Sequence, residues 1–421
     1  MPIWEQRGLS GAREARSIAL EVARRLSSAE HTYPDEPCDS SLAGGEAGLA
    51  LLFGYLDQCF PNDGWDSAAH AAMLRIGASI AKSASLPIGL FGGLSGIAYA
   101  SWYLSHGDTR YLRARTAIDD VLLPRATAVA HSFADRYGMA VEDFDIVSGL
   151  SGVAAYLLCR TSDDRIYATL KAVISSLVEI VERDMSPPAW FTPANLISGK
   201  AMIGKYPQGN LNCGVAHGAP GMLSVLALAY RQDAAVPGLR SAIERLARWL
   251  MEQRRMERWG ASWPASVGVS ASDLSTPAPV GWCYGNPGVA RALWLAGEAL
   301  DDPALIEGAM EALRSAHRHP VSRRAEFSPT FCHGAAGLLQ ITMRFAHETN
   351  SPEFSDAADL VLQRLLSLFA DDALYGYRDY EPDSGPADRR GLLDGAAGVA
   401  LVLCATATNQ DPAWDRVFVL S

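Results

Sequence analysis

The sequence predicts an all-α protein built as a closed (α/α)7 toroid, with seven outer helices around seven inner ones. Three observations predict it. A Gly-x-x-Gly unit recurs seven times along the 421 residues, an apolar run follows each unit, and an amphipathic stretch precedes each unit. The first glycines of neighbouring units are 48 residues apart (Gly45 to Gly93) to 69 residues apart (Gly149 to Gly218). A unit that recurs at intervals of tens of residues is typical of stacked helical hairpins.

The glycine units mark the expected starts of the inner helices. Apolar runs such as 153–158 and 399–403 predict helices that are buried on all sides. Glycine would let the backbones converge there and would supply the unusual φ values of a sharp entry turn. The glycine pairs are Gly45/Gly48, Gly93/Gly96, Gly149/Gly152, Gly218/Gly221, Gly285/Gly288, Gly334/Gly337 and Gly395/Gly398.

The amphipathic stretches are expected to form the outer helices. In 241–250, Ile243, Leu246, Ala247 and Leu250 follow the i, i+3, i+4, i+7 pattern, with charges on the opposite face. A closed ring is favoured over an open helical solenoid because closure buries both ends of the array. Strand signals are few, so no sheet is expected in the main body. Similar stretches cover 11–28, 66–82, 110–131, 164–184, 303–317 and 354–370.

The whole chain, 1–421, is predicted to be a single toroid domain with one interruption. Residues 185–212 lack a helical period and are expected to form an ordered loop or small insertion. Trp190, Phe191 and the turn at 205–209 favour an ordered segment, and long insertions of this kind are often functional. The stretch 259–281, rich in Ser, Pro, Gly and Val, has the same character.

Composition excludes several classes of function. The chain has 36 Lys and Arg against 47 Asp and Glu, a net charge of -11, and no basic block, so nucleic acid is not an expected partner. The N-terminus lacks an apolar signal core, and no segment has the roughly 18 apolar residues that span a bilayer. We therefore expect a cytoplasmic protein that is not an integral membrane protein. Its 7 cysteines are not expected to form a disulfide framework there.

Polar residues occur at matching places in the repeat. Two residues before the first glycine stand Cys283 and Cys332; one residue before it stand His217, Tyr284 and His333. In a closed ring these places would share one rim. Two thiolates and one imidazole without a fourth protein ligand are typical of a catalytic zinc site with an open position.

Zinc held by two thiolates favours thiol alkylation or conjugate addition over hydrolysis, because it lowers the pKa of an incoming thiol. Addition to an activated alkene creates an enolate, which His217 could protonate. Asp145 would orient His217 and raise its proton affinity, and Tyr284 would donate a hydrogen bond to the enolate oxygen. The alternatives are a structural His217, Asp145 as a helix N-cap, and Tyr284 packed against the metal ligands. Asp394 is interpreted as an N-cap.

At these residues the sequence resembles the lanthipeptide cyclases, or lanthionine synthetase C-like proteins, over nearly its whole length. The motifs that carry the resemblance are Gly-Val-Ala-His-Gly (214–218), Trp-Cys-Tyr-Gly-Asn-Pro-Gly (282–288) and Cys-His-Gly-Ala-Ala-Gly (332–337). Segments 145–152 and 206–209 also fit.

The resemblance implies an α-toroid that holds Zn²⁺ through Cys283, Cys332 and His333. It implies that Cys thiols of a dehydrated precursor peptide add to dehydroalanine or dehydrobutyrine, which forms lanthionine or methyllanthionine rings. His217, Asp145 and Tyr284 would be the catalytic residues that are not ligands.

The chain resembles the stand-alone class I enzymes, which implies a separate dehydratase as partner. A transporter would join in a synthetase complex, through which the protein would associate peripherally with the membrane. Since small peptide-binding insertions occur in the family, 185–212 is the candidate for one here.

The sequence departs from the family at one place. An Arg usually precedes the Trp-Cys-Tyr-Gly motif, but 276–281 reads Thr-Pro-Ala-Pro-Val-Gly. Arg389 or Arg390 is the candidate to replace it. Two other functions stay open. One is another zinc-thiolate alkylation, such as prenyl transfer or glutathione addition. The other is a non-catalytic zinc-bearing scaffold that presents the precursor to a dehydratase.

Overall fold

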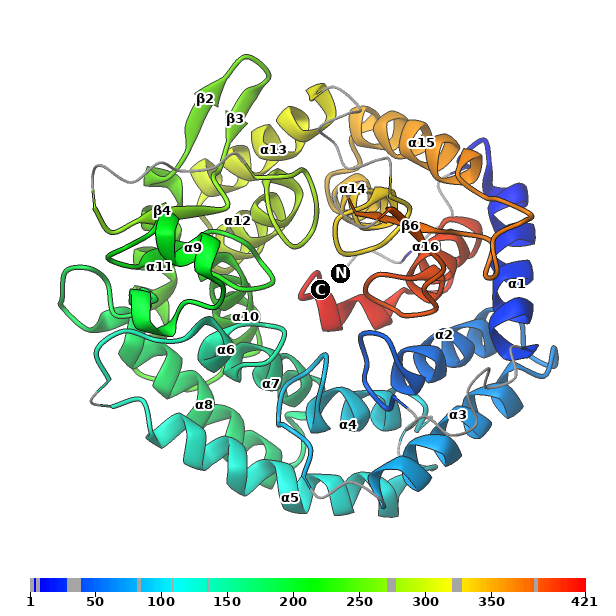
Figure 1. Cartoon of the computed structure of the whole chain (residues 1–421), viewed down its shortest axis with the longest axis horizontal. Coiled ribbons are helices and arrows are strands. Elements are labelled where there is room, and N and C mark those ends of the chain that lie inside the picture. Colours follow the sequence, from blue (N-terminus) through cyan, green and yellow to red (C-terminus); the bar gives the residue numbers. More distant parts are fainter. Residues whose placement is uncertain are drawn as a thin grey trace. The chain divides into compact units, whose positions relative to one another are not determined.

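The computed structural model is mainly helical (Figure 1). It describes residues 4, 8–28, 39–81, 85–105, 107, 109–134, 136–270, 278–319, 328–381 and 385–421. Contacts divide the chain into two compact units. The first comprises 1–87, 91–117 and 320–415, and the second comprises 88–90, 118–319 and 416–421.

The inner helices begin where the glycine units predict. Within the described ranges, each of the seven starts at the residue after the first glycine of a unit, as α16 does after Gly395. In α16 every residue from Ala396 to Thr406 is buried, which agrees with its uniformly apolar sequence. These helices are α2 (Glu46–Cys59), α4 (Leu94–Tyr103), α7 (Leu150–Leu157), α10 (Ala219–Arg231), α12 (Asn286–Leu300), α14 (Ala335–Thr349) and α16 (Ala396–Ala407).

The amphipathic stretches form the other long helices, as predicted. In α11 the buried residues include Ile243, Leu246, Ala247 and Leu250, which is the face that the periodicity indicates. The set comprises α1 (Ala12–Ser28), α3 (Trp65–Ile80), α5 (Leu112–His131), α8 (Asp164–Glu182), α11 (Leu239–Glu252), α13 (Pro303–Arg318) and α15 (Pro352–Ser367). No helix in the described part of the chain is both long and apolar enough to cross a bilayer.

Most inner helices pack against the amphipathic helix that follows them in the chain, although α10 makes its most extensive contact with α12. In the second unit the pairs are α7 with α8, α10 with α11, and α12 with α13. In the first unit they are α2 with α3 and α14 with α15, and α16 packs against α1. The first helix thus completes the last pair. An open solenoid would leave both of these helices at exposed ends, so the open alternative is not supported.

The strands are short antiparallel pairs. They are β1 (Asn210–Asn212) with β4 (Ser266–Gly268), β2 (Arg255–Glu257) with β3 (Gly260–Ser262), and β5 (Asp379–Glu381) with β6 (Gly385–Ala387). The pairing of Leu211 with Val267 joins the two segments that lack a helical period in the sequence. Segment 185–212 also holds the 3₁₀ helix η2 (Ala194–Leu196) and α9 (Lys200–Lys205). Its role in peptide binding stays a prediction. The other short helices are α6 (Val141–Phe144), η1 (Leu158–Arg160) and η3 (Ala413–Phe418).

The glycine units have a steric reason that differs from the expected one. Of the first glycines only Gly285 has a positive φ, +96°, whereas Gly45 has -106°, so the expected unusual φ is wrong at six of the seven. A Cβ on Gly48 would instead lie 2.6 Å from the Leu42 carbonyl oxygen. In the same way, a Cβ would meet the carbonyl oxygen of the residue six places earlier at Gly152, Gly221, Gly288 and Gly398.

We predict that Gly221→Ala destabilises the protein, whereas Gly77→Ala does not. The Gly221 Cβ would press on the Val215 carbonyl, and overpacking of this kind costs about 1–3 kcal/mol. Gly77 lies on the exposed face of α3 with open space around it, and alanine there should stabilise the helix by up to about 1 kcal/mol. Urea unfolding followed by circular dichroism measures both. Equal effects of the two substitutions would contradict the steric explanation.

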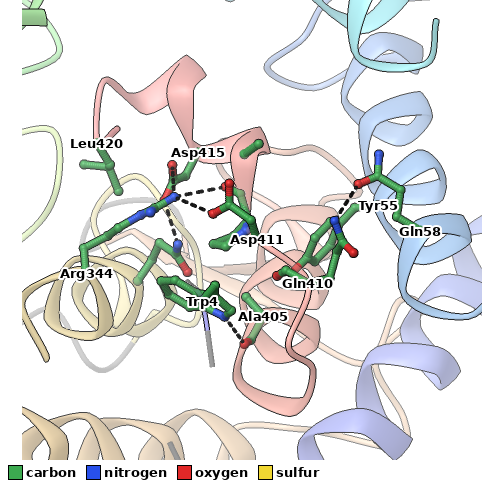
Figure 2. Close-up of polar contacts among 12 residues, drawn as sticks. Trp4, Tyr55, Gln58, Arg344, Ala405, Gln410, Asp411, Asp415 and Leu420 are labelled. Atoms are coloured by element: carbon green, nitrogen blue, oxygen red, sulfur yellow. Dashed lines mark hydrogen bonds and ion pairs between the residues drawn. The ribbon is translucent and has the colours of Figure 1, made fainter. Parts of the chain in front are cut away.

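A buried ion pair fixes the C-terminal segment on α14 (Figure 2). The Arg344 guanidinium donates to both carboxylate oxygens of Asp415, at 2.7 and 2.9 Å, and the Asp415 side chain is fully buried. Gln340 donates to the same carboxylate at 2.7 Å. Burial alone would lower the pKa of Arg344, but the charge of Asp415 raises it above its ordinary value. The guanidinium of Arg344 therefore keeps its charge in spite of its burial.

Removing one partner of this pair should be costly. We expect Asp415→Ala to lower the free energy of unfolding by about 3–5 kcal/mol, because it leaves a buried guanidinium uncompensated. Asp411 lies 3.7 Å from the same Arg344, but its side chain is 54% exposed. Asp411→Ala is therefore the matched control and should cost about 0–1 kcal/mol. A comparable shift of the urea midpoint in both variants would refute the assignment.

Candidate active site and metal centre

Main-chain hydrogen bonds connect the turns that precede the inner helices of the first unit. The N–H of Cys332 donates to the carbonyl of Leu393, that of Leu393 donates to Ala43, and that of Ala43 donates to Phe91, each at 3.0 Å. These are the residues two places before the first glycine of their units. Residues that occupy equivalent positions of the sequence repeat are therefore hydrogen-bonded to one another in this unit.

The second unit has the same kind of connection. The N–H of Ala216 donates to the carbonyl of Cys283 at 3.3 Å, and that of Ile146 donates to Ala216 at 3.1 Å. In the third repeat the donor is thus Ile146 rather than Val147, one residue earlier than the alignment predicts. These bonds bring the turn that carries His217 beside the turn that carries Tyr284.

Asp145 connects two parts of the second unit through its two carboxylate oxygens. Oδ1 accepts from the N–H groups of Ser148 (2.6 Å) and Gly149 (2.8 Å), while Oδ2 lies 2.6 Å from Nδ1 of His217. The N-cap of α7 is Gly149, so the N-cap alternative for Asp145 is wrong. The carboxylate instead accepts hydrogen bonds from the turn before α7, and this contact orients its other oxygen toward the imidazole of His217.

The environment of His217 favours its protonated form. Burial alone would lower the pKa of the imidazole, but the hydrogen bond and charge of Asp145 outweigh this effect and raise it, with a smaller contribution from Cys283. The Asp145 side chain is 1% exposed, whereas that of His217 is 37% exposed. The ring is therefore anchored on one side and accessible, which suits a proton donor.

Tyr284 lies next to this pair. Its ring centroid is 6.3 Å from that of His217, and its hydroxyl accepts a 2.9 Å hydrogen bond from Nδ2 of Asn212. Asn212 is in β1, and its Oδ1 accepts from the N–H of Gly214. Asn212 could not be predicted from the sequence, because no motif or repeat position distinguishes it.

In the first unit Cys332, His333 and Asp394 gather ligand atoms that all lie within 4.8 Å of one another. The three residues are half-buried, and thiolate and imidazole are ligands that zinc prefers. The N-cap of α16 is Gly395, with no side-chain cap, so the N-cap interpretation of Asp394 is wrong. Its signal was its position directly before the glycine, which it shares with His333. Cys283, which is 8% exposed, belongs to the second unit.

A second carboxylate contacts His333. Oδ1 of Asp379 lies 3.3 Å from its Nε2, and Arg389 Nε lies 3.4 Å from the other oxygen. Burial would raise the pKa of Asp379, but its interactions with His333 and Ser328 lower it. Arg390 pairs with Glu46 at 3.2 Å. The replacement of the missing arginine by Arg389 or Arg390 stays a prediction.

The family model, one curated relative and one solved structure relate the chain to the same group of proteins. The family model of the lanthionine synthetase C-like proteins matches residues 36–419. The nisin biosynthesis protein NisC of Lactococcus lactis subsp. lactis is 25% identical over 327 residues, which cover 75% of this chain and 72% of that protein. Among solved structures, nisin cyclase matches with a TM-score of 0.79 at 20% identity and 97% coverage of both chains. An unsaturated glucuronyl hydrolase specific for heparin matches with a TM-score of 0.47 at 9% identity, covering 95% and 97%.

The match to nisin cyclase, an α/α toroid, shows the fold and confirms the predicted class. The family model spans nearly the whole chain. The chain therefore belongs to the lanthionine synthetase C-like family.

Proposed function

We propose that this chain is a zinc-dependent lanthipeptide cyclase. It joins Cys thiols of a dehydrated precursor peptide to dehydroalanine or dehydrobutyrine and forms lanthionine and methyllanthionine rings. The observation that carries the proposal is the clustering of Cys332 and His333 as metal-ligand candidates in a member of this family.

The zinc ligands in this proposal are Cys332, His333 and Cys283. The first two offer sulfur and nitrogen donors within 4.8 Å of each other, a set that fits zinc better than magnesium or calcium. Cys283 is included from its position in the repeat, which equals that of Cys332. When bound, the metal would lower the pKa of an incoming thiol and keep its sulfur nucleophilic at neutral pH.

The residues of the second unit complete the addition. As the sulfur forms its bond to the β-carbon of the dehydro residue, the alkene electron pair moves onto the α-carbon and carbonyl oxygen. The thiol loses its proton to solvent, and His217, whose protonated form Asp145 favours, donates a proton to the α-carbon and regains one from solvent. Tyr284 donates a hydrogen bond to the enolate oxygen. Asp145 orients the imidazole, because one of its oxygens holds the turn before α7 and the other contacts Nδ1 of His217.

The substrate requires an earlier reaction. A separate dehydratase must eliminate water from Ser and Thr of the precursor peptide before thiols can add to it. We propose that both enzymes act in the cytoplasm, in a synthetase complex that includes a transporter and associates peripherally with the membrane. Segment 185–212 is the candidate peptide-binding surface.

Zinc content and ring formation test the proposal together. The purified protein should hold about one zinc per chain by elemental mass spectrometry, and Cys332→Ala should lose the metal together with ring formation on a dehydrated peptide. Cys159, half-buried and bonded to the Ala155 carbonyl, offers the control Cys159→Ala, which should retain both. A wild type that stays metal-free after zinc supplementation, or rings made by Cys332→Ala at the normal rate, would refute the mechanism.

The charge of Asp145 should control the titration of His217. In Asp145→Asn the pKa of His217 should fall below its ordinary value, because burial remains while the opposing charge is lost. The basic limb of the pH–rate profile should then move to lower pH. Glu142→Gln removes an exposed charge that acts more weakly on the same ring and should shift the pKa far less. Histidine NMR titration measures all three proteins.

The same substitution has a stability consequence with a defined sign. Because the folded-state pKa of His217 is raised, the pair stabilises the protein fully below the unfolded pKa of about 6.5. This contribution is lost as the pH rises through the raised value. The stability difference between wild type and Asp145→Asn should therefore shrink above that pH. A constant difference between pH 5 and 9 would contradict the ion pair.

A further inference from the structure

The two ring nitrogens of His333 face two different carboxylates. Nε2 lies 3.3 Å from Oδ1 of Asp379, and Nδ1 lies 4.0 Å from Oδ1 of Asp394. Nδ1 therefore faces Asp394, which belongs with Cys332 to the candidate ligand group, whereas Nε2 faces a carboxylate that is not part of this group.

Asp379 is held firmly for this contact. Its side chain is 1% exposed, and Oδ1 accepts a 2.9 Å hydrogen bond from Ser328 Oγ. Ser328 Oγ also accepts from the N–H of Thr330 in the segment that leads into α14. Arg389 neutralises the other oxygen from 3.4 Å. A buried carboxylate with this many fixed contacts can hold an imidazole in one orientation.

The backbone position of Asp379 is fixed as well. It opens β5 and pairs in register with Ala387 of β6, and the register continues through Tyr380 with Pro386. The hairpin lies between α15 and α16 in the chain. A rigid strand thus places the carboxylate beside the turn that carries His333.

We propose that Asp379 is a positioning residue for the metal ligand His333. From its 3.3 Å contact the carboxylate would accept the Nε2–H of the imidazole once zinc is bound, which would fix the tautomer with a lone pair on Nδ1 and leave that nitrogen to ligate the metal. A neutral imidazole carries only one N–H, and metal-bound histidines usually give theirs to a carboxylate or carbonyl. This proposal rests on the proposed zinc site. It adds that Nδ1 of His333 is the ligand atom and that Asp379 determines this choice.

The test is the zinc affinity of variants, measured by competition with a chromophoric chelator. Asp379→Ala should bind zinc about 10- to 100-fold more weakly, the usual cost of losing such an outer partner. Asp379→Asn should keep part of the affinity, because its amide oxygen can still accept the Nε2–H. Asp388, which follows β6 and pairs with Arg378 at 3.6 Å, gives the control Asp388→Asn with unchanged affinity.

Two further readouts separate positioning from a general structural role. Ring ¹⁵N spectra of the zinc-loaded wild type should show His333 protonated at Nε2 and metal-bound at Nδ1. Cobalt-substituted Asp379→Asn should keep its thiolate-to-metal absorption, which shows that the variant is folded and still holds the cysteine ligation. Reversed nitrogen assignments, or affinities within twofold of wild type in both Asp379 variants, would overturn the inference alone. A wild type that binds no zinc would instead refute the proposed function.

Discussion

The close approach of main chains at the starts of the inner helices is the constraint on which the rest of the structure depends. A Cβ at the second glycine of a unit would meet the carbonyl six residues earlier, as at Gly221 and Val215. Without that Cβ the turn can pack closely, and neighbouring turns are joined by main-chain hydrogen bonds, such as the one from the N–H of Cys332 to the carbonyl of Leu393. The residues just before each glycine are thereby held at one level within each unit.

Much of the fold could be predicted because its signals are local. The 3.6-residue period of α11 and the apolar run of α16 lie within single helices. The reason for the glycines could not be predicted, because it is a close contact with the carbonyl six residues earlier, and the residue types of the turn do not reveal that geometry. The β1–β4 pair was equally hidden, since three-residue strands carry too little pattern to be recognised.

The candidate site divides in the same way. His217, Tyr284 and His333 were found because they share a repeat phase, and Asp145 because it lies close before a glycine unit. Asp379 has no such mark. Its partner Ser328 is 51 residues away in the chain, so only tertiary structure brings the two together. Asp394 had the right phase, but a carboxylate ahead of a helix is more often a cap, and this general preference of aspartate led to the wrong prediction.

The two histidines occupy the same place in their repeats and yet suit opposite tasks. Asp145 contacts Nδ1 of His217 and raises the pKa of the imidazole, which favours the protonated ring that the proposed acid requires. Asp379 lies against Nε2 of His333, and Nδ1 faces Asp394. In the proposed function, His217 is the acid and His333 is the ligand. They differ in which ring nitrogen lies against a buried carboxylate and not in their position in the repeat. The same position of the repeat can therefore hold a histidine for either task, depending on which ring nitrogen a buried carboxylate contacts.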